Sequence, residues 1–184
     1  IKSNQLDAYD FAKKAKSLGF EGIEYVNQLY PDVMKSKNKG AALKTFIAKS
    51  NAAAEKHAIE NLLIMIDGEG DLAVAGATER DRAIENHKAW VETAAAMGCH
   101  SIRINLFGEN DPQRWKKYAA ESMRKLGEFS EAYKVNIIVE NHGYLSSNAA
   151  LVMEMLSLVN RSNCGTLPDF GNFCLERKNN VRWD

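Results

Sequence analysis

The chain has 184 residues, 45% of them hydrophobic and 26% charged, a composition typical of a globular domain rather than of a fibrous or disordered protein. Its 24 basic and 24 acidic side chains cancel, so the chain lacks the overall positive charge expected of a dedicated nucleic-acid-binding protein. No apolar run approaches the ~20 residues that a membrane-spanning helix needs. We therefore expect neither nucleic acid nor a membrane as a partner.

Two hydrophobic patterns alternate along the whole chain. Some segments repeat apolar residues at helical spacing, and the short segments between them are apolar throughout, as strands covered on both faces are. Gly19 and Gly98 are typical helix stop signals, and Asp111 followed by Pro112 is a typical helix start. In chain order, the expected elements are a helix over 6–18, a strand over 22–26, a helix over 41–57, a strand over 61–66, a helix over 78–97, a strand over 101–105, a helix over 111–129, a strand over 136–139, a helix over 147–159 and a strand over 164–167.

The spacing of the strands predicts a βα repeat. Their centres, at Ile23, Ile64, Ile104, Ile138 and Leu167, are separated by a mean of 36 residues. Such a repeat fits an open doubly wound sheet or a TIM (β/α)8 barrel. A polar cluster follows every strand. An open sheet gathers its ligand residues at one switch point, whereas a barrel draws them from many strand ends, so the clusters favour the barrel.

The chain is short for this fold. At the observed repeat, 184 residues hold about five βα units, whereas a closed barrel needs roughly 250 residues. We therefore expect residues 1–184 to form a single, incomplete barrel domain that covers about strands 2 to 6. Such a domain would be a portion of a larger protein, or a partner would complete it.

Two carboxylates at strand ends are the sharpest chemical feature. Glu140 ends the apolar run 136–139, and Asp169 follows the next strand. On adjacent parallel strands these carboxylates could lie about 5 Å apart. A divalent cation would relieve their repulsion, and hard oxygen ligands suit Mg²⁺ or Mn²⁺. The alternative for each residue is a structural role, as a helix cap or as the partner of an arginine.

Other polar residues near the strand ends are candidate substrate contacts. His142 shares a strand face with Glu140 and is a candidate metal ligand, substrate contact or structural histidine. Arg103, within a strand, needs a partner, either a neighbouring carboxylate or an anionic or hydroxyl-rich substrate. Glu24 is likewise a candidate for a structural ion pair or for a substrate contact, and it could be the residue that anchors Arg103. The full set of candidate substrate-binding residues is Glu24, Arg103, Asn105, His142 and Asn172. We assign no chemistry to the histidines at positions 57, 87 and 100.

The segment 68–73 matches the G-x-G-x-x-A pattern of dinucleotide-binding loops. A true fingerprint needs a helix that starts within the glycines, and here the next helix waits until Thr78. Glu69 and Asp71 would also face the phosphates with the wrong sign of charge. We therefore expect no dinucleotide cofactor and assign no cofactor-binding residues.

Four segments together resemble the xylose isomerase-like barrel superfamily, above all its sugar phosphate isomerase/epimerase branch. The most specific are E-N-H-G at 140–143 and P-D-F-G-N-F at 168–173, and the others are 18–26 and 99–105. The resemblance implies a (β/α)8 barrel with one divalent cation, Mn²⁺ or Mg²⁺ first and Zn²⁺ or Co²⁺ as alternatives. In that superfamily Glu, Asp, His and Glu from successive strand ends hold the ion. Glu140 matches the first ligand and Asp169 the second, and the residues after them, including the polar loop expected over 176–180, offer no third or fourth.

The resemblance also implies a reaction. In the epimerase branch the first Glu also serves as acid and base, paired with the last Glu across the sugar, and the pair moves a proton through a metal-stabilised enediolate. Glu140 is therefore the expected catalytic residue. The chain is then a divalent-metal-dependent isomerase or epimerase of a sugar or sugar phosphate, though without two of the metal ligands this chain alone could be inactive. A small carbohydrate is its expected partner, and a homo-oligomer is left open. The alternatives are a lyase or dehydratase on a polyol or keto-sugar, and a non-catalytic carbohydrate-binding barrel. The DNA-repair endonucleases of the superfamily need histidine ligands at earlier strand ends, where this chain has Asn27, Asp67 and Asn105.

Overall fold

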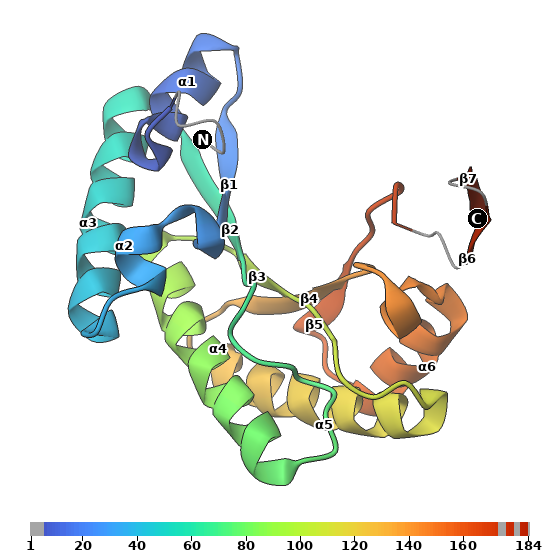
Figure 1. Cartoon of the computed structure of the whole chain (residues 1–184). Helices are drawn as coiled ribbons and strands as arrows, with labels where there is room; N and C mark the ends of the chain where they lie inside the picture. Colours follow the sequence, from blue (N-terminus) through green and yellow to red (C-terminus); the bar gives the residue numbers. More distant parts are fainter. Residues whose placement is uncertain (1–5, 173–175, 179–180, 184) are drawn as a thin grey trace.

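A parallel sheet of five strands forms the centre of the molecule (Figure 1). The computed structural model describes residues 6–172, 176–178 and 181–183. The strands lie side by side in the order of the sequence, and every neighbouring pair is parallel. Sequential order with a helix in each crossover is the arrangement of consecutive barrel strands, so the expected α/β fold is confirmed as a partial TIM barrel. The strands are β1 (Gly22–Val26), β2 (Glu60–Met65), β3 (Ser101–Ile104), β4 (Asn136–Glu140) and β5 (Cys164–Leu167).

The helices cover the outer side of this curved sheet, and none of the described helices lies against its inner side (Figure 1). Each long helix follows one strand and packs back on the sheet, which buries the apolar stripe found in the sequence. Helices η1 (Ala8–Asp10) and α1 (Phe11–Ser17) precede β1. The connecting helices are α3 (Lys39–His57), α4 (Ala77–Met97), α5 (Pro112–Glu131) and α6 (Ala149–Val159). Three short helices, η2 (Asn27–Leu29), α2 (Pro31–Met34) and η3 (Tyr144–Ser147), lie in the loops.

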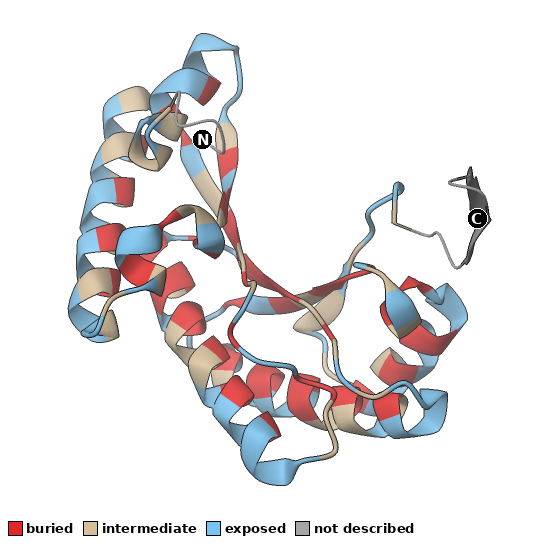
Figure 2. Ribbon diagram, in the orientation of Figure 1, coloured by how far each residue is buried: buried red, intermediate tan, exposed pale blue. Residues whose placement is uncertain are grey.

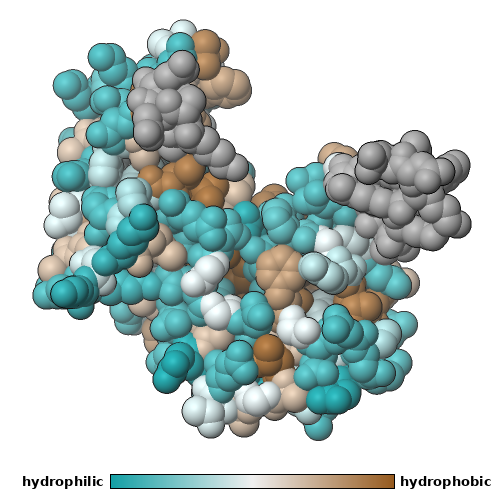
Figure 3. Space-filling view, viewed as in Figure 1, coloured by the Kyte–Doolittle hydropathy of each residue, from teal (hydrophilic) through white to brown (hydrophobic). Residues whose placement is uncertain are grey.

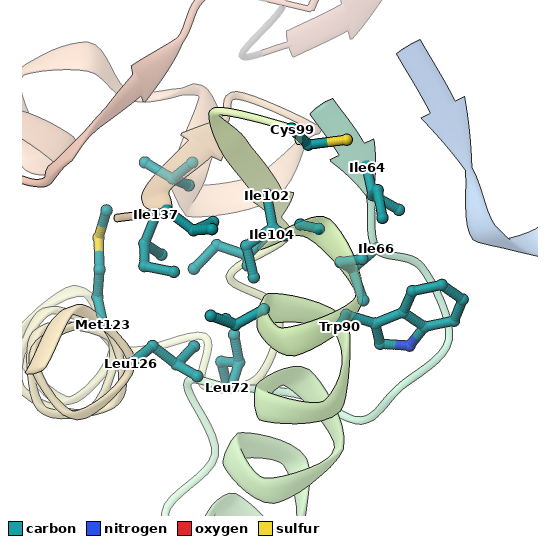
Figure 4. Packing of buried hydrophobic residues seen from close by; sticks show 14 of the residues in the cluster. Ile64, Ile66, Leu72, Trp90, Cys99, Ile102, Ile104, Met123, Leu126 and Ile137 are labelled. Atoms are coloured by element: carbon teal, nitrogen blue, oxygen red, sulfur yellow. The ribbon is translucent and has the colours of Figure 1, made fainter. Parts of the chain in front are cut away.

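The hydrophobic core lies between the sheet and the helices. Alternate strand residues such as Ile102, Ile104 and Ile137 are completely buried on the outer face, where they meet Trp90 of α4 and Met123 of α5 (Figures 2 and 4). On the inner face Glu24 is exposed and Met65 and Ile138 are only partly buried, whereas all four residues of β3, including Arg103, are buried. The partial exposure of this face is expected of barrel strands whose interior is not closed.

The structure corrects two local expectations. Helix α4 begins at Ala77 with Gly76 as its N-cap, and no side chain caps it, so Thr78 does not open the helix. The polar stretch expected to be a loop instead contains β6 (Glu176–Lys178), which pairs antiparallel with β7 (Val181–Trp183). A two-stranded ribbon needs only backbone pairing, so its charged residues gave no hydrophobic signal. Residues 179–180 of the expected loop lie outside the described residues.

No helix in the described residues has the length and hydrophobicity required to cross a membrane.

Candidate functional site

Arg103 connects the carboxyl ends of three neighbouring strands. Its Nη1 donates to Oδ1 of Asp67, after β2, at 2.7 Å, and its Nε lies 2.8 Å from Oε2 of Glu140, at the end of β4. The second contact is an ion pair without the alignment of a hydrogen bond. Arg103 and Glu140 have side-chain exposures of only 4% and 9%. The positive charge of Arg103 in β3 is therefore paired with neighbouring carboxylates. This is one of the two kinds of partner that the sequence left open, the other being a substrate.

Asp67 is held in place from both sides of its strand. The buried amide of Asn27, after β1, donates to the backbone carbonyl of Asp67 at 2.9 Å and accepts from its backbone nitrogen at 3.0 Å. Asn105, after β3, donates its amide to the Asp67 carboxylate at 2.7 Å. These bonds fix the Asp67 carboxylate before any ligand arrives, as a preorganised site requires.

Glu140 receives two further contacts at its other oxygen. Nδ1 of His142 lies 2.9 Å from Oε1, and the amide of Asn172, in the loop after β5, donates to the same oxygen at 3.2 Å. The His142 side chain is 47% exposed, so its ring borders solvent while Glu140 is buried beneath it. The fold therefore brings together Arg103, Glu140, His142 and Asn172, with Asn105 joined to the same network through Asp67.

Asp169 lies beside this network, with its side chain exposed. Its backbone is tied to the β4 end by Asn141, whose amide donates to the Asp169 carbonyl at 2.8 Å and accepts from its nitrogen at 2.7 Å. The Asp169 carboxylate accepts from the backbone nitrogen of Gly171 at 2.7 Å. Among the described residues no hydrogen bond or ion pair joins this carboxylate to Glu140. The two strand ends are thus adjacent, but each carboxylate is satisfied separately.

Glu24 is exposed on β1 and does not enter the Arg103 network. None of the hydrogen bonds or ion pairs among the described residues connects it to Arg103, Asp67 or Glu140. On β1 the residue that joins the network is Asn27, through the Asp67 backbone.

A pocket of about 290 Å³ opens in front of these strand ends. Its lining comes from the strand ends and the loops after them, including the β2–α4 loop, and from α4. In the view of Figure 3, hydrophilic residues cover most of the surface and hydrophobic ones form small patches between them. A polar pocket of this size fits a small hydroxylated molecule better than an apolar one. The polar side chains that line it include those of Asp67, Glu69, Asp71, His87, Asn105 and His142.

Three residues of this site, Asp67, Asn27 and His87, were not predicted from the sequence. Asp67 carried a signal, because it ends an apolar strand, but it was not singled out among the strand-end clusters. Asn27 carried a similar signal after β1. His87 carried none, because a histidine on the buried face of a helix reads as a core residue.

Two of the described residues are candidate ligands for a metal ion. Glu140 and Asp169 offer oxygen ligands from adjacent strand ends, which is the donor type that Mg²⁺ and Mn²⁺ prefer. No group of three or more His, Cys, Asp or Glu side chains within the described ranges is arranged to hold an ion. Arg103 also already compensates the charge of Glu140. Glu140 and Asp169 are thus suitable as two ligands of a cation, but the described residues do not supply the remaining ligands.

The fold is that of a (β/α) barrel, and the polar network lies at the carboxyl ends of its strands, the end at which barrels of this kind carry their sites. Residues 12–182 match the family model of the xylose isomerase-like TIM barrel, and the chain belongs to this family. A search of curated proteins found no match.

Solved structures, two of them of sugar epimerases, share the fold. The chain is similar to a D-psicose 3-epimerase crystallised in the presence of D-fructose, with 15% identity and a TM-score of 0.71 over 90% of this chain and 58% of that one. It is similar to the 3-keto-D-glucoside 4-epimerase YcjR from E. coli, with 13% identity and a TM-score of 0.72 over 89% of this chain and 64% of that one. A third is the IOLI protein with a bound zinc atom, with 19% identity and a TM-score of 0.70 over 89% and 58% of the two chains. The chain thus spans about three fifths of the length of these structures, and at these identities the likeness shows the fold.

Proposed function

We propose that this protein acts on a small sugar as an isomerase or epimerase, with Glu140 as the acid and base. The observation that supports this most is the buried Glu140 carboxylate at the end of β4, held by Arg103, His142 and Asn172. A carboxylate fixed from three sides at the strand ends of a barrel is preorganised to take a proton from a bound substrate.

The proposed reaction is an internal proton transfer. The Glu140 carboxylate takes the proton from a carbon next to the substrate carbonyl, whose electrons move to the carbonyl oxygen and form an enediolate. If Glu140 returns the proton to the neighbouring carbon, while the hydroxyl proton beside it passes to the former carbonyl oxygen, the product is an isomer. An epimer requires a second acid on the opposite side of the sugar to donate a proton to the other face of the first carbon, while Glu140 keeps the proton it took. His142 and Asn105, which line the pocket, would bind substrate hydroxyls, and Asn172 would orient Glu140.

A divalent cation is part of the proposal. When bound at Glu140 and Asp169, Mn²⁺ or Mg²⁺, or alternatively Zn²⁺ or Co²⁺, would stabilise the negative charge that develops on the substrate oxygen. Arg103 would keep Glu140 in place with or without the ion, because it approaches Oε2 from within the sheet.

Deuterium exchange tests the proposal directly. The full-length protein is incubated with Mn²⁺ in deuterated water with D-fructose, D-tagatose, D-psicose and D-fructose 6-phosphate, and proton NMR follows the hydrogens next to each carbonyl. Deuterium uptake in one of these sugars that a Glu140→Gln variant does not catalyse would support the proposal. Binding without exchange would instead support a non-catalytic carbohydrate-binding barrel, and release of a dehydrated product would support a lyase.

A further inference from the structure

The part of the pocket lining that the β2–α4 loop forms is attached to helix α4. At Gly70 a Cβ would lie 2.9 Å from Cβ of Ala83, so only glycine allows the loop to approach the helix this closely. Asn86 donates its amide to the carbonyl of Glu69 at 3.0 Å, and Trp90 donates its indole nitrogen to the Glu69 carboxylate at 2.6 Å. Glu69 also pairs with Lys39 of α3. The β2–α4 loop is therefore fixed before a ligand binds.

His87 reaches the pocket from this same face of α4. The residue is only 2% exposed, yet it is among the residues that line the pocket. Its Nδ1 lies 2.7 Å from the carbonyl of Ala83, and because a carbonyl only accepts, Nδ1 carries the proton and donates. In the neutral ring Nε2 is then an acceptor, and none of the described residues bonds to it. Burial lowers the pKa of His87, which favours this neutral form.

The charges around the pocket disfavour an anion. Three carboxylates line it, and no lysine or arginine is among the lining residues within the described part of the chain. Arg103 pairs with Asp67 and Lys39 with Glu69, so these two cations are already engaged. The exposed Asp71 adds a negative charge at the pocket edge. A phosphate group here would meet carboxylates and no lysine or arginine among the lining residues, whereas hydroxyl groups can bond to the polar side chains of the lining without a charge penalty.

We propose that this pocket binds the hydroxylated, uncharged part of the sugar, and that Nε2 of His87 accepts a hydrogen bond from one of its hydroxyls. The inference rests on the proposed carbohydrate function and narrows it to unphosphorylated sugars. It gives a role in ligand recognition to a helix residue 53 positions away from Glu140 in the sequence.

NMR of ¹⁵N-labelled histidine tests the role of the ring. The full-length protein is titrated with D-fructose and with D-fructose 6-phosphate, while calorimetry measures affinity for both. Only four histidines are present, and a His87→Asn variant assigns the His87 signals. We expect D-fructose to shift the Nε2 resonance of His87 and to bind more tightly than its phosphate. D-Fructose binding that leaves His87 unperturbed, or tighter binding of the phosphate, would overturn this inference alone. Absence of binding by either sugar would also overturn this inference, whereas the proposed function is decided separately by deuterium exchange with the full panel of sugars.

Two substitutions at the same position separate ligand recognition from packing. The amide nitrogen of His87→Asn can replace Nδ1 as the donor to Ala83 but leaves no acceptor at the Nε2 position, so D-fructose should bind about three- to tenfold more weakly. The longer side chain of His87→Gln can place its amide oxygen at the Nε2 position as an acceptor, but it loses the hydrogen bond to the Ala83 carbonyl. The affinity of this variant for D-fructose should therefore stay within about twofold of the wild type. Equal loss of affinity in both variants would assign His87 a purely structural role.

Discussion

Nε of Arg103 and Oε2 of Glu140 lie 2.8 Å apart across adjacent strands, and both side chains are more than nine-tenths buried. Burying either charge alone would cost several kcal/mol, and the pairing offsets part of this desolvation cost for both residues. Asp67 completes the arrangement by pairing with the other end of the guanidinium at 2.7 Å. The proposed catalytic carboxylate is thus also a structural partner in the sheet.

Replacing Arg103 should therefore destabilise the protein strongly. Arg103→Met keeps much of the side-chain volume but leaves two carboxylates without their cation, one of them buried. We expect the free energy of unfolding to fall by about 3–5 kcal/mol, measured by urea denaturation. Arg114→Met is the matched control, because Arg114 pairs with Glu109 while 56% exposed and its loss should cost no more than about 1 kcal/mol. Similar losses in both variants would contradict the buried-pair argument.

Glu140→Gln should abolish proton exchange without abolishing substrate binding. Glutamine keeps the shape of the side chain but cannot take a proton from carbon. We expect deuterium incorporation to fall at least about 10²- to 10⁴-fold, the range for removal of a general acid–base group. Asn172→Ala removes one contact that orients Glu140 and should cause a smaller loss in rate. A Glu140→Gln variant that retains wild-type exchange would exclude this residue as the base.

Asp169→Asn should weaken metal binding while leaving the fold intact. Asparagine can still accept the hydrogen bond from the Gly171 nitrogen, so the turn is preserved. Because a neutral amide is a poorer ligand than a carboxylate, calorimetric titration with Mn²⁺ should show weaker binding. Asp111→Asn is the control, since Asp111 makes a similar bond, to the Arg114 nitrogen at 2.8 Å, at the start of α5. Equal Mn²⁺ affinity in both variants would show that Asp169 is not a ligand.

Stability should fall in acid because of His87. Burial lowers the pKa of this ring from 6.5, so the folded protein keeps it neutral where the unfolded chain binds a proton. The unfolded state binds more protons below pH 6.5, and the free energy of unfolding therefore decreases as pH falls through this range, by at most about 1.4 kcal/mol per pH unit from this residue. The difference between wild type and His87→Asn, measured by urea denaturation from pH 5 to 8, isolates this contribution. Parallel pH profiles would contradict it.

Gly108 should tolerate no side chain. It forms a bridge with Ala73, and a Cβ would lie 2.3 Å from the Ala73 carbonyl carbon. Gly108→Ala should therefore destabilise the protein by about 1–3 kcal/mol more than Gly19→Ala. Gly19 also has positive φ but has nothing within 4 Å, so this control carries the backbone strain without the clash. Loosening of the loop should also weaken sugar binding, because the neighbouring Phe107 lines the pocket.

The local pattern of the sequence determined the elements and the fold class. Apolar runs such as 101–105 and 136–139 predicted strands that helices cover, and the structure places β3 and β4 there. The same pattern placed Glu140 at a strand end. Hydrophobic periodicity and strand termination are properties of consecutive residues, so they can be read without knowing what lies beside them in space.

Only the tertiary structure decided which side chains meet. Asp67 and Glu140 flank Arg103 because of the register between three strands. Glu24 does not join them, although the sequence left it open as a partner of Arg103. Likewise, the buried face of a helix has the same pattern whether it meets a core or a pocket, so nothing in the sequence separated His87 from a core histidine. Contacts between distant segments depend on register and packing, and these are set by the whole fold rather than by neighbouring residues.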